Sequence, residues 1–571
     1  MKNILILTDG YINYTIINSI IFDKKNKVFI LPLRDRDIFK LHDFKEHIID
    51  EKLYFNNNTH SKVLQISNTV KNLINEILTI QLNSIKVKSI NIWFSNFFIK
   101  NFLNYKLKII FSLNNIFNLY NFDDVIYFNA NSKYDNIDLI NILLNSFNQK
   151  FSIYKKKIKI KKKINFQFPI NLFKFYNSLI NLNNNIVITS KNYNCYEIAK
   201  NSLNTSSNLI VLSDTINFID IFKNIINGNL KTFFLLSSKI KNFTHKINYN
   251  LFISKFPLKK DPKLIRYFQK NLESIYNDNL IQILQKCEYL VHSFRKSIPK
   301  VFFSTDSNYI NGFIGEFANF KKIPSYCITH GTHTAPKNKY EEIYQKDIAE
   351  SVILNQYKFI VSQSTFCDEF LKHYQTESKI IKTKPLVYSY LNTAPPYNRT
   401  LLHASTTKTE VSQKFWGVET INEYLQSISD IGDVAYDLKF NLIVKPHPSF
   451  SKIIDIKYLK KYFSNKNIVF TDDSFKNCLK KSDILISYSS TTIEESLYNR
   501  RPVILYDRNN RYNHLDAQMI SNNFFSKKKP YFYFTNKINL EKYINIIYQT
   551  HYENQFNYDL IFKNHYKNLK I

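Results

Sequence analysis

Two short polar segments near the carboxyl end of the chain carry side chains that could bind a phosphate group. The segment KPHP at 445–448 follows the apolar run Leu442–Val444, and SSTT at 489–492 follows the apolar run Ile484–Ile486. Proline closes a central strand, and SSTT leads directly into the helical pattern Ile493–Asn499. The N–H groups of a first helical turn are unpaired and the helix dipole is positive there, so this pattern favours an anion site.

A run of Ser and Thr is also the preferred kind of helix N-cap, so the hydroxyl run alone is more typical of a cap than of a ligand site. Its combination with His447 at one strand end, and with Glu494 and Glu495 in the following helix, favours a ligand site. Pro502–Leu505 predicts the next buried strand and completes a β-α-β unit of a parallel sheet. Open α/β sheets bind ligands at the carboxyl edge, where these segments are expected to converge.

A second histidine stands at a predicted strand end further upstream. Ser325–Thr329 reads as a strand, and it ends in His330, where Gly331 permits a sharp turn. The imidazole is therefore expected to face a cleft, although a histidine hydrogen-bonded within a turn is the alternative. Asp306 and Glu316, on the preceding elements, are the other candidates for a base beside it.

These motifs resemble a family. KPHP, then SDILISYSSTTIEESL and RPVILY, together with IPSYCITHGT at 323–332, look like the two-domain GT-B glycosyltransferases of bacterial surface polysaccharide synthesis. The resemblance is to nonulosonate and Kdo transferases and to CDP-glycerol glycerophosphotransferases of teichoic acid synthesis. It covers roughly 301–507. Leu401–Thr406 resembles the first strand and loop of a GT-B donor domain, but it lacks the glycine of that loop.

The resemblance implies a transfer that needs no metal. His330 would be the general base on the acceptor hydroxyl, and His447 would donate to the leaving phosphate. Glu495 would hold ribose hydroxyls. The donor-binding residues that the resemblance implies are Lys445, Ser489, Ser490, Thr491, Thr492, Glu495 and Ser405. The expected partners are a nucleotide-activated sugar, cytidine-linked, and a glycan, lipid-linked or protein acceptor, with no cofactor besides the donor.

Three other functions stay open from the sequence. A CDP-glycerol-type glycerophosphotransferase carries similar motifs, and a sugar-nucleotide 2-epimerase has a similar build, although the length and the His-Gly-Thr segment argue against the epimerase. The third is a polyanion-binding protein that is not an enzyme. Such a protein would bind polyanions with a steep salt dependence and would ignore cytidine nucleotides.

The charge of the chain is strongly positive: Lys and Arg number 78 against 46 Asp and Glu, which gives +32. That charge fits nucleic acid, an anionic membrane surface or an acidic substrate. Lys, Asn, Ile, Tyr and Phe are all abundant, as AT-rich codons would produce, so part of the excess reflects composition. We expect no nucleic-acid partner.

The lysine-rich segment Tyr154–Lys163 is expected to be a linker or the outer face of an edge strand. Peripheral contact with an anionic membrane is the alternative for this segment, and a solvated lysine edge is favoured over it. The expected location is cytoplasmic, at most peripheral to the inner face of the membrane, because no apolar run is long enough to span a bilayer and MKNILILTDG reads as a first strand rather than a signal peptide.

Several motif classes are absent. The five cysteines lie far apart and predict reduced core thiols, neither a disulfide framework nor a zinc site. The seven glycines form no GxGxxG and no GxxxxGK[ST] loop, so a phosphate would be held by hydroxyls, histidine and helix N-termini. Asp35-Arg36-Asp37 has the acid-x-acid spacing of metal-dependent transferases, a tripeptide that is common by chance.

The 571 residues predict an α/β protein of the GT-B type, with two facing Rossmann-like domains and an additional N-terminal α/β region. The expected boundaries are 1–165 for the N-terminal region, 166–385 for the acceptor-side domain and 386–571 for the donor-binding domain. Strands are predicted in the first part at Ile4–Leu7, Val28–Leu31, Ile90–Trp93, Ile109–Phe111 and Val125–Phe128, with helices at Lys71–Gln81 and Ile137–Phe147.

Overall fold

The structure is a computed structural model. It describes residues 1–82, 86–87, 90–91, 97–130, 136–156, 170–189, 195–196, 198–199, 208–213, 230–237, 246–258, 261–295, 297–308, 310–328, 333–354, 356–363, 365–383, 388, 391, 393–406, 419–451, 456–463, 468–513, 515, 517–519 and 529–558.

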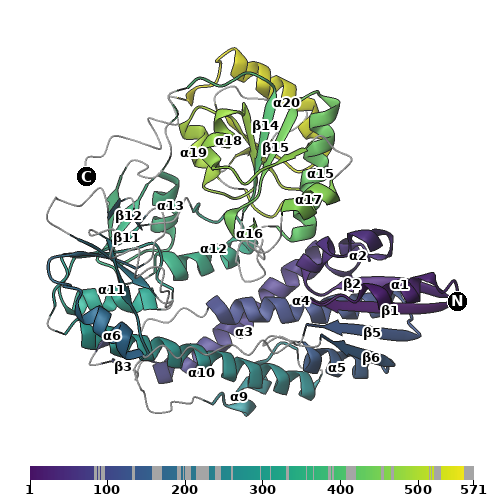
Figure 1. The fold of residues 1–571 in the computed structure, drawn as a ribbon, viewed down its shortest axis with the longest axis horizontal. Coiled ribbons are helices and arrows are strands. Elements are labelled where there is room, and N and C mark those ends of the chain that lie inside the picture. The colour runs from purple at the N-terminus through teal and green to yellow at the C-terminus, as the bar shows by residue number, and fades with distance from the viewer. Residues whose placement is uncertain are drawn as a thin grey trace.

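Three parallel sheets follow one another along the chain, each covered by helices (Figure 1). Their strands lie between residues 2 and 155, 186 and 382, and 400 and 534, and the expected domain boundaries stay predictions. The chain therefore has the predicted α/β class: an N-terminal α/β region followed by two Rossmann-like domains, as in the GT-B type. Among the described helices, none combines the length and the apolar character needed to cross a bilayer.

The N-terminal sheet has four strands. Their order is β2 (Asn26–Pro32), β1 (Lys2–Asp9), β5 (Asp124–Asn129) and β6 (Phe151–Lys155). Two 3₁₀ helices, η1 (Asp35–Phe39) and η2 (His42–His47), follow β2. The α-helices are α1 (Tyr14–Phe22), α2 (Glu51–Tyr54), α3 (Asn57–Leu82), α4 (Phe97–Leu119) and α5 (Ile137–Ser146). The two-residue strands β3 (Lys86–Val87) and β4 (Ile90–Asn91) pair only with each other among the described residues.

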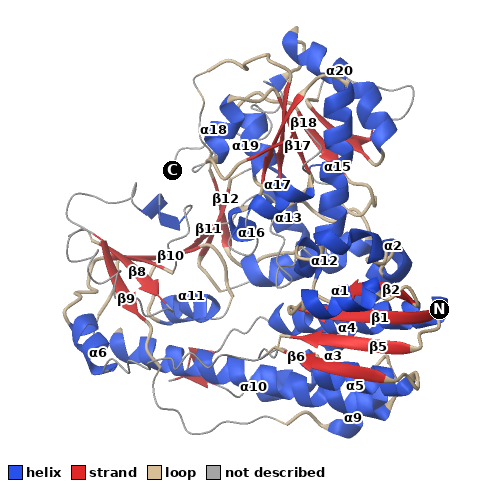
Figure 2. Cartoon of the chain, turned by 45° about the vertical axis from the view of Figure 1, so that its right-hand side comes forward, coloured by secondary structure: helices blue, strands red, loops and turns tan. Residues whose placement is uncertain are grey.

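The middle sheet has seven strands. Their order is β13 (Lys379–Lys382), β12 (Phe359–Ser362), β11 (Ser325–Ile328), β10 (Val301–Ser304), β7 (Ile186–Ile188), β8 (Leu209–Ser213) and β9 (Leu230–Phe234). Its helices are α6 (Ile170–Ser178), α9 (Tyr249–Lys255), α10 (Pro262–Ser293), α11 (Ile310–Phe320), α12 (Lys339–Val352) and α13 (Thr365–His373). Helix α10 packs on α11 of this domain and on α4 and α5 of the N-terminal region, so it connects the two along the bottom of both views (Figure 2).

The C-terminal sheet also has seven strands. Their order is β16 (Ile468–Phe470), β15 (Asn441–Lys445), β14 (Thr400–Ala404), β17 (Ile484–Ser487), β18 (Val503–Tyr506), β20 (Tyr531–Phe534) and β19 (Gln518–Met519). Its helices are α15 (Ile421–Asp437), α16 (Pro448–Ser451), α17 (Ile456–Tyr462), α18 (Phe475–Lys480), α19 (Thr492–Tyr498) and α20 (Lys537–Tyr552).

Short apolar runs form most of the central strands, as expected for parallel strands that are covered on both faces. One prediction in the first part was wrong: Ile109–Phe111 lies within α4 and is not a strand. The buried residues Ile99, Leu103 and Leu107 precede it at four-residue spacing, so the run is one part of a helical face. Of the predicted strand Ile90–Trp93, the structure describes only residues 90–91, which form β4 outside the parallel sheets.

Buried ion pairs attach the N-terminal region to the middle domain. Lys71 of α3 and Lys100 of α4 are 1% and 3% exposed, so both ammonium groups need partners inside the protein. Lys71 Nζ lies 2.9 Å from Asp347 and 2.9 Å from Glu350, both on α12, and Lys100 also contacts Asp347. The two regions therefore share one charge network.

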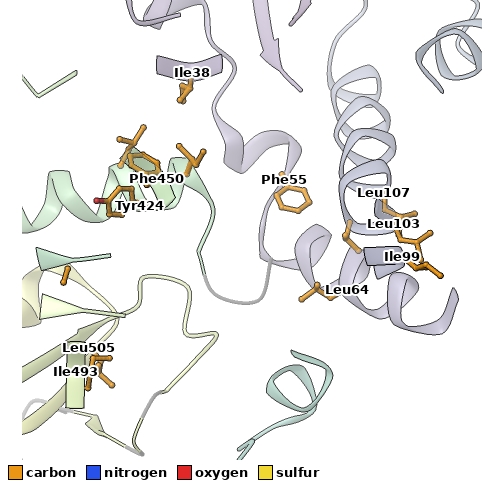
Figure 3. Packing of buried hydrophobic residues seen from close by; sticks show 14 of the residues in the cluster. Ile38, Phe55, Leu64, Ile99, Leu103, Leu107, Tyr424, Phe450, Ile493 and Leu505 are labelled. Carbon is orange, nitrogen blue, oxygen red and sulfur yellow. The ribbon is translucent and has the colours of Figure 1, made fainter. Parts of the chain in front are cut away.

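The N-terminal region also packs on the C-terminal domain. Figure 3 shows Ile38 of η1 facing Phe450 and Tyr424, and the Phe39 ring lies 6.0 Å from Phe450. Arg511 donates to Asn57 of α3 (Nε–Oδ1 3.0 Å) and to Glu423 of α15 (Nη1–Oε2 2.9 Å). The buried Arg511 guanidinium thus bonds a residue that lies 454 positions before it in the chain. The N-terminal region is in contact with both Rossmann-like domains.

Candidate functional site

Three strand ends meet at the carboxyl edge of the C-terminal sheet. In the register, Ala404 of β14 pairs with Lys445 of β15, and His403 pairs with Ile486 of β17. β14 comes first in the chain, β15 lies on one side of it and β17 on the other, so the direction of the strand order changes at β14. This is the position at which open α/β sheets bind ligands. The segments that follow the three strands contain Ser405, His447 and the SSTT run.

The His447 backbone and ring are both held in place. Its backbone N–H donates to Ser405 Oγ (3.0 Å), and the Ser449 backbone N–H donates to His447 Nδ1 (3.1 Å). Because Nδ1 accepts a hydrogen bond, the neutral imidazole carries its proton on Nε2. The half-buried His447 therefore has the tautomer that donates from Nε2.

Ser405 is a structural partner of His447 and lies 6% exposed at the end of β14. Its backbone N–H donates to the Lys445 carbonyl (3.3 Å), and its side chain lies beside that of Tyr424. The two loops after β14 and β15 are thereby connected through Ser405. This role as a support for the histidine loop was not part of the sequence prediction, which placed Ser405 at the donor.

His403 is a buried histidine that the sequence analysis did not single out. Its Nδ1 lies 3.0 Å from the Ile486 carbonyl oxygen, which can only accept, so Nδ1 carries a proton and donates. The ring stacks on Tyr424 at 5.6 Å between centroids. The only available signal was a histidine within an otherwise apolar strand.

The SSTT run follows β17 as predicted and leads into α19. Ser489 and Ser490 are buried, and the Thr492 backbone N–H donates to Ser490 Oγ (3.3 Å). Thr491, at the N-cap position, makes no capping hydrogen bond with its side chain. Ser490 therefore acts as a cap, which is the alternative considered from the sequence, and α19 is only seven residues long, so its dipole contribution is small.

The two glutamates of α19 differ in position. Glu494 is fully buried and accepts a hydrogen bond from the Tyr388 hydroxyl, whereas the Glu495 side chain is partly exposed. Tyr388 lies in the segment between the two sheets, so Glu494 connects that segment to the donor-side domain. Glu495 is the more accessible carboxylate of the pair, and its assignment to ribose hydroxyls stays a prediction.

Asp507, at the end of β18, is a buried carboxylate surrounded by donors. It accepts from the backbone N–H groups of Arg511 (2.6 Å) and Tyr512 (3.0 Å) and from the Tyr533 hydroxyl (2.9 Å). Burial raises the pKa of Asp507 above its usual range, and these hydrogen bonds oppose the shift. The carboxylate fixes the loop 507–513 and with it the ring of Tyr512.

Tyr512 brings the two Rossmann-like domains together. Its hydroxyl accepts from Gln345 Nε2 of α12 (3.3 Å), and the side chains of Thr334 and Ser489 lie close enough to lower its pKa. Thr334 lies four residues beyond His330, and Ser489 is the first residue of SSTT. Burial raises the pKa of Tyr512 to about 12, so the hydroxyl is neutral at cellular pH. Sequence reasoning missed this residue because nothing near it in the chain shows its partners.

His330 lies outside the described residues, as do Thr329, Gly331 and Thr332. The residues on either side are described: β11 ends at Ile328, and His333 is buried with its ring 5.3 Å from Phe370. The segment that contains His330 therefore begins at the end of β11 and continues into His333 and Thr334. The assignment of His330 as a base remains a prediction.

The two alternative bases have different environments. Asp306, just after β10, is largely enclosed and accepts from Asn311 Nδ2 (2.9 Å) and from the Asn308 backbone N–H (2.9 Å). Burial raises its pKa. Glu316 on α11 is half-buried, and burial raises its pKa as well. Asp306 thus organises the loop after β10, next to β11. The hydrogen bonds from Asn311 and Asn308 both go to one of its carboxylate oxygens.

The Asp35-Arg36-Asp37 tripeptide is engaged within the N-terminal region. Both aspartates are buried: Asp35 contacts Lys108, and Asp37 Oδ2 accepts from the Gly10 backbone N–H (2.6 Å). The two carboxylates therefore have separate structural roles. Among the described residues, no group of three or more His, Cys, Asp or Glu side chains is arranged to hold a metal ion. The five cysteines are buried, and each is a thiol outside any disulfide.

Comparisons with known proteins give structural neighbours only. No family model matches the chain, and no curated protein matches it in sequence. A structure of the wall teichoic acid polymerase TagF is 11% identical with a TM-score of 0.34, and the match covers 69% of this chain and 88% of that one. S. aureus MnaA, solved with UDP, is 10% identical (TM-score 0.33; 57% and 79%). MurG of Acinetobacter baumannii is 8% identical (TM-score 0.31; 57% and 77%).

A teichoic acid enzyme is thus among the neighbours, as the resemblance of the motifs predicted. Likenesses at this level carry no argument about the activity of this chain. The case for a function rests on the contacts described above: an oriented histidine, a hydroxyl run at the carboxyl edge of one sheet, and a tyrosine that connects that run to the facing domain.

Proposed function

We propose that the chain is a metal-independent glycosyltransferase that moves a sugar from a cytidine-activated donor, such as a CMP-nonulosonate or CMP-Kdo, onto a surface-glycan or glycoconjugate acceptor. The observation that carries the proposal is the Tyr512 hydroxyl, which accepts a hydrogen bond from Gln345 of the middle domain and lies close to Ser489 of the hydroxyl run and to Thr334, four residues beyond His330. It supports the view that the binding site for the nucleotide donor (the donor seat) and the proposed base His330 belong to one site between the two domains.

At the donor seat, we propose that His447 and the hydroxyl run donate hydrogen bonds to the phosphate. The Ser449 N–H fixes the tautomer in which His447 donates from Nε2. Such a donor stabilises negative charge as it develops on the leaving nucleotide. Ser489 and Ser490 would add hydroxyl hydrogen bonds, with Lys445 supplying positive charge at the end of β15. Glu495, the accessible carboxylate of α19, would accept from ribose hydroxyls.

On the acceptor side, His330 would take the proton of the acceptor hydroxyl. The acceptor oxygen then forms a bond to the anomeric carbon, the bond from that carbon to the phosphate oxygen breaks, and the nucleotide leaves with the electron pair. An imidazole with a pKa of about 6.5 is half deprotonated close to cellular pH, which suits a base. The acceptor is a glycan, lipid-linked or protein hydroxyl.

A thermal-shift panel of CMP, CDP, UDP, GDP and single-stranded DNA tests the proposal. We expect CMP or CDP to raise the melting temperature most, because ligands that bind only the folded state stabilise it. Preference for CDP over CMP would favour the glycerophosphotransferase alternative, and preference for UDP the epimerase. Stabilisation by DNA alone, lost steeply with salt, would refute an enzyme of this class in favour of a polyanion-binding protein.

A further inference from the structure

The amino edge of the middle sheet, where its strands begin, lies opposite the carboxyl edge at which β11 ends before His333 and Thr334. The three loops that enter β7, β10 and β11 contact one another there. Asn184 N–H donates to the Ile298 carbonyl (3.0 Å), and Phe302 N–H donates to the Pro324 carbonyl (3.0 Å). Because parallel strands all begin at the same edge, side chains from these loops lie side by side.

Large apolar side chains gather on this edge. Leu179 is 64% exposed, Ile298 61% and Phe320 56%, one from each loop. Phe175, one helical turn before Leu179 at the end of α6, is 62% exposed. Single exposed apolar residues are normal, but four on one edge indicate a contact surface. Both views place α6 at the lower left of the molecule, away from the C-terminal domain (Figures 1 and 2).

Basic side chains surround these apolar ones. Arg295, Lys300 and Lys322 are exposed, and Lys321 Nζ donates to the Arg295 carbonyl (3.3 Å), which joins two of the loops. No Asp or Glu occurs in residues 179–185, 294–300 or 319–324. The nearest carboxylate along these elements is the half-buried Glu316 on α11. The surface is therefore positive as well as apolar.

We propose that this amino-edge surface, made of Leu179, Arg295, Ile298, Lys300, Phe320 and Lys322, binds the surface of an anionic phospholipid bilayer. Basic side chains are attracted to anionic headgroups, and apolar side chains beside them gain from insertion at the boundary of the acyl chains. Nucleic acid would use the charges and could stack on Phe320, but it offers nothing to Leu179 and Ile298, which carry no π-face. The exposed Leu179 and Ile298 side chains therefore favour a lipid surface over nucleic acid.

Membrane contact was the alternative considered for Tyr154–Lys163, and the structure offers a different location. Tyr154 and Lys155 end the edge strand β6 and Lys156 is exposed, while 157–163 lie outside the described residues. The amino-edge surface belongs to another domain. Its proposed binding to lipid does not depend on the proposed transfer reaction, so failure of one proposal leaves the other standing.

Sedimentation of the full chain with phospholipid vesicles tests the inference. We expect binding to vesicles of phosphatidylcholine mixed with phosphatidylglycerol, weaker at high salt, and little binding to phosphatidylcholine alone. Arg295→Gln combined with Lys322→Gln should lower the vesicle affinity about 25-fold, at about fivefold for each charge near the membrane. Leu179→Ser combined with Ile298→Ser should lower it about tenfold or more.

Matched control variants on other domains are Lys24→Gln with Lys25→Gln, in the loop after α1, and Ile538→Ser on α20, where the side chain is 77% exposed. These should keep wild-type affinity, and all variants should melt at the wild-type temperature because the substituted residues are exposed. Absence of binding to the anionic vesicles would overturn the inference. It would also be overturned if the controls lost as much affinity as the surface variants, or if the charge variant lost affinity for single-stranded DNA while the apolar variant had no effect on vesicles.

Discussion

Removing the Tyr512 hydroxyl tests whether it couples the two domains. Tyr512→Phe keeps the ring, which packs edge-on against Tyr344 at 5.9 Å and Tyr488 at 6.4 Å, and deletes the hydrogen bond to Gln345. That hydrogen bond crosses between domains. At about 0.5–1.5 kcal/mol for one neutral hydrogen bond, its loss weakens the closed arrangement about 2–13-fold.

The assay is steady-state release of nucleotide from the donor that the thermal-shift panel identifies, together with calorimetry of nucleotide binding. We expect kcat/KM to fall within the range given above, and nucleotide affinity to change less, because the donor seat stays in one domain. The matched control is Tyr533→Phe, which removes a hydroxyl bonded to Asp507 (2.9 Å) in the same buried network. If Tyr512→Phe loses no more activity than Tyr533→Phe, the coupling through Tyr512 is refuted.

Four further predictions concern the site and the fold. His447→Ala should lower turnover by about 10²–10³, the range for one lost transition-state donor, and unchanged steady-state turnover would exclude this role. His330→Ala should abolish transfer with nucleotide affinity nearly intact, whereas Ser490→Ala should weaken nucleotide binding; equal losses in calorimetry would place both residues in one phosphate site. Activity should survive EDTA, and a loss restored by Mg²⁺ or Mn²⁺ would contradict metal independence. Burial lowers the pKa of His551 from 6.5 to about 3, and nearby Arg501 adds to the shift. Over this pH range the unfolded chain therefore binds a proton that the folded chain does not. Urea midpoints should fall as the pH drops from about 6.5 towards 3, and His551→Gln should remove this effect.

Much of the fold could be predicted because buried parallel strands are short apolar runs, and the runs at Ile4–Leu7, Leu442–Val444 and Ile484–Ile486 all lie in strands. Hydrophobic periodicity distinguishes a strand from a helix less well where a short apolar run lies inside a longer pattern. Ile109–Phe111 has the composition of a strand, but the helical face of α4 continues through it. A longer window, which includes Leu103 and Leu107, shows the helical period.

The candidate site could be predicted from the sequence only where a single motif lies at the end of a single strand. The KPHP and SSTT segments fall at the same sheet edge because the parallel register fixes where β15 and β17 end. The support of His447 by Ser405 and the contact of Tyr512 with Gln345 depend on tertiary packing between distant residues. The Gln345–Tyr512 pair is separated by 167 positions, and nothing in the local sequence of either residue indicates the other.

The ion pairs between Lys71, Lys100 and Asp347 have a consequence for synthesis of the protein. Lys71 and Asp347 are 276 residues apart, so at about 5–20 residues per second the acid leaves the ribosome roughly 14–55 s after the lysine. During that interval α3 and α4 cannot bury these ammonium groups against α12, since an unpaired buried charge is strongly unfavourable. The N-terminal region is therefore not completed until α12 of the middle domain has been translated. Protease digestion of ribosome-stalled chains that end before and well beyond residue 350 would show the nascent N-terminal region becoming resistant only in the longer chains.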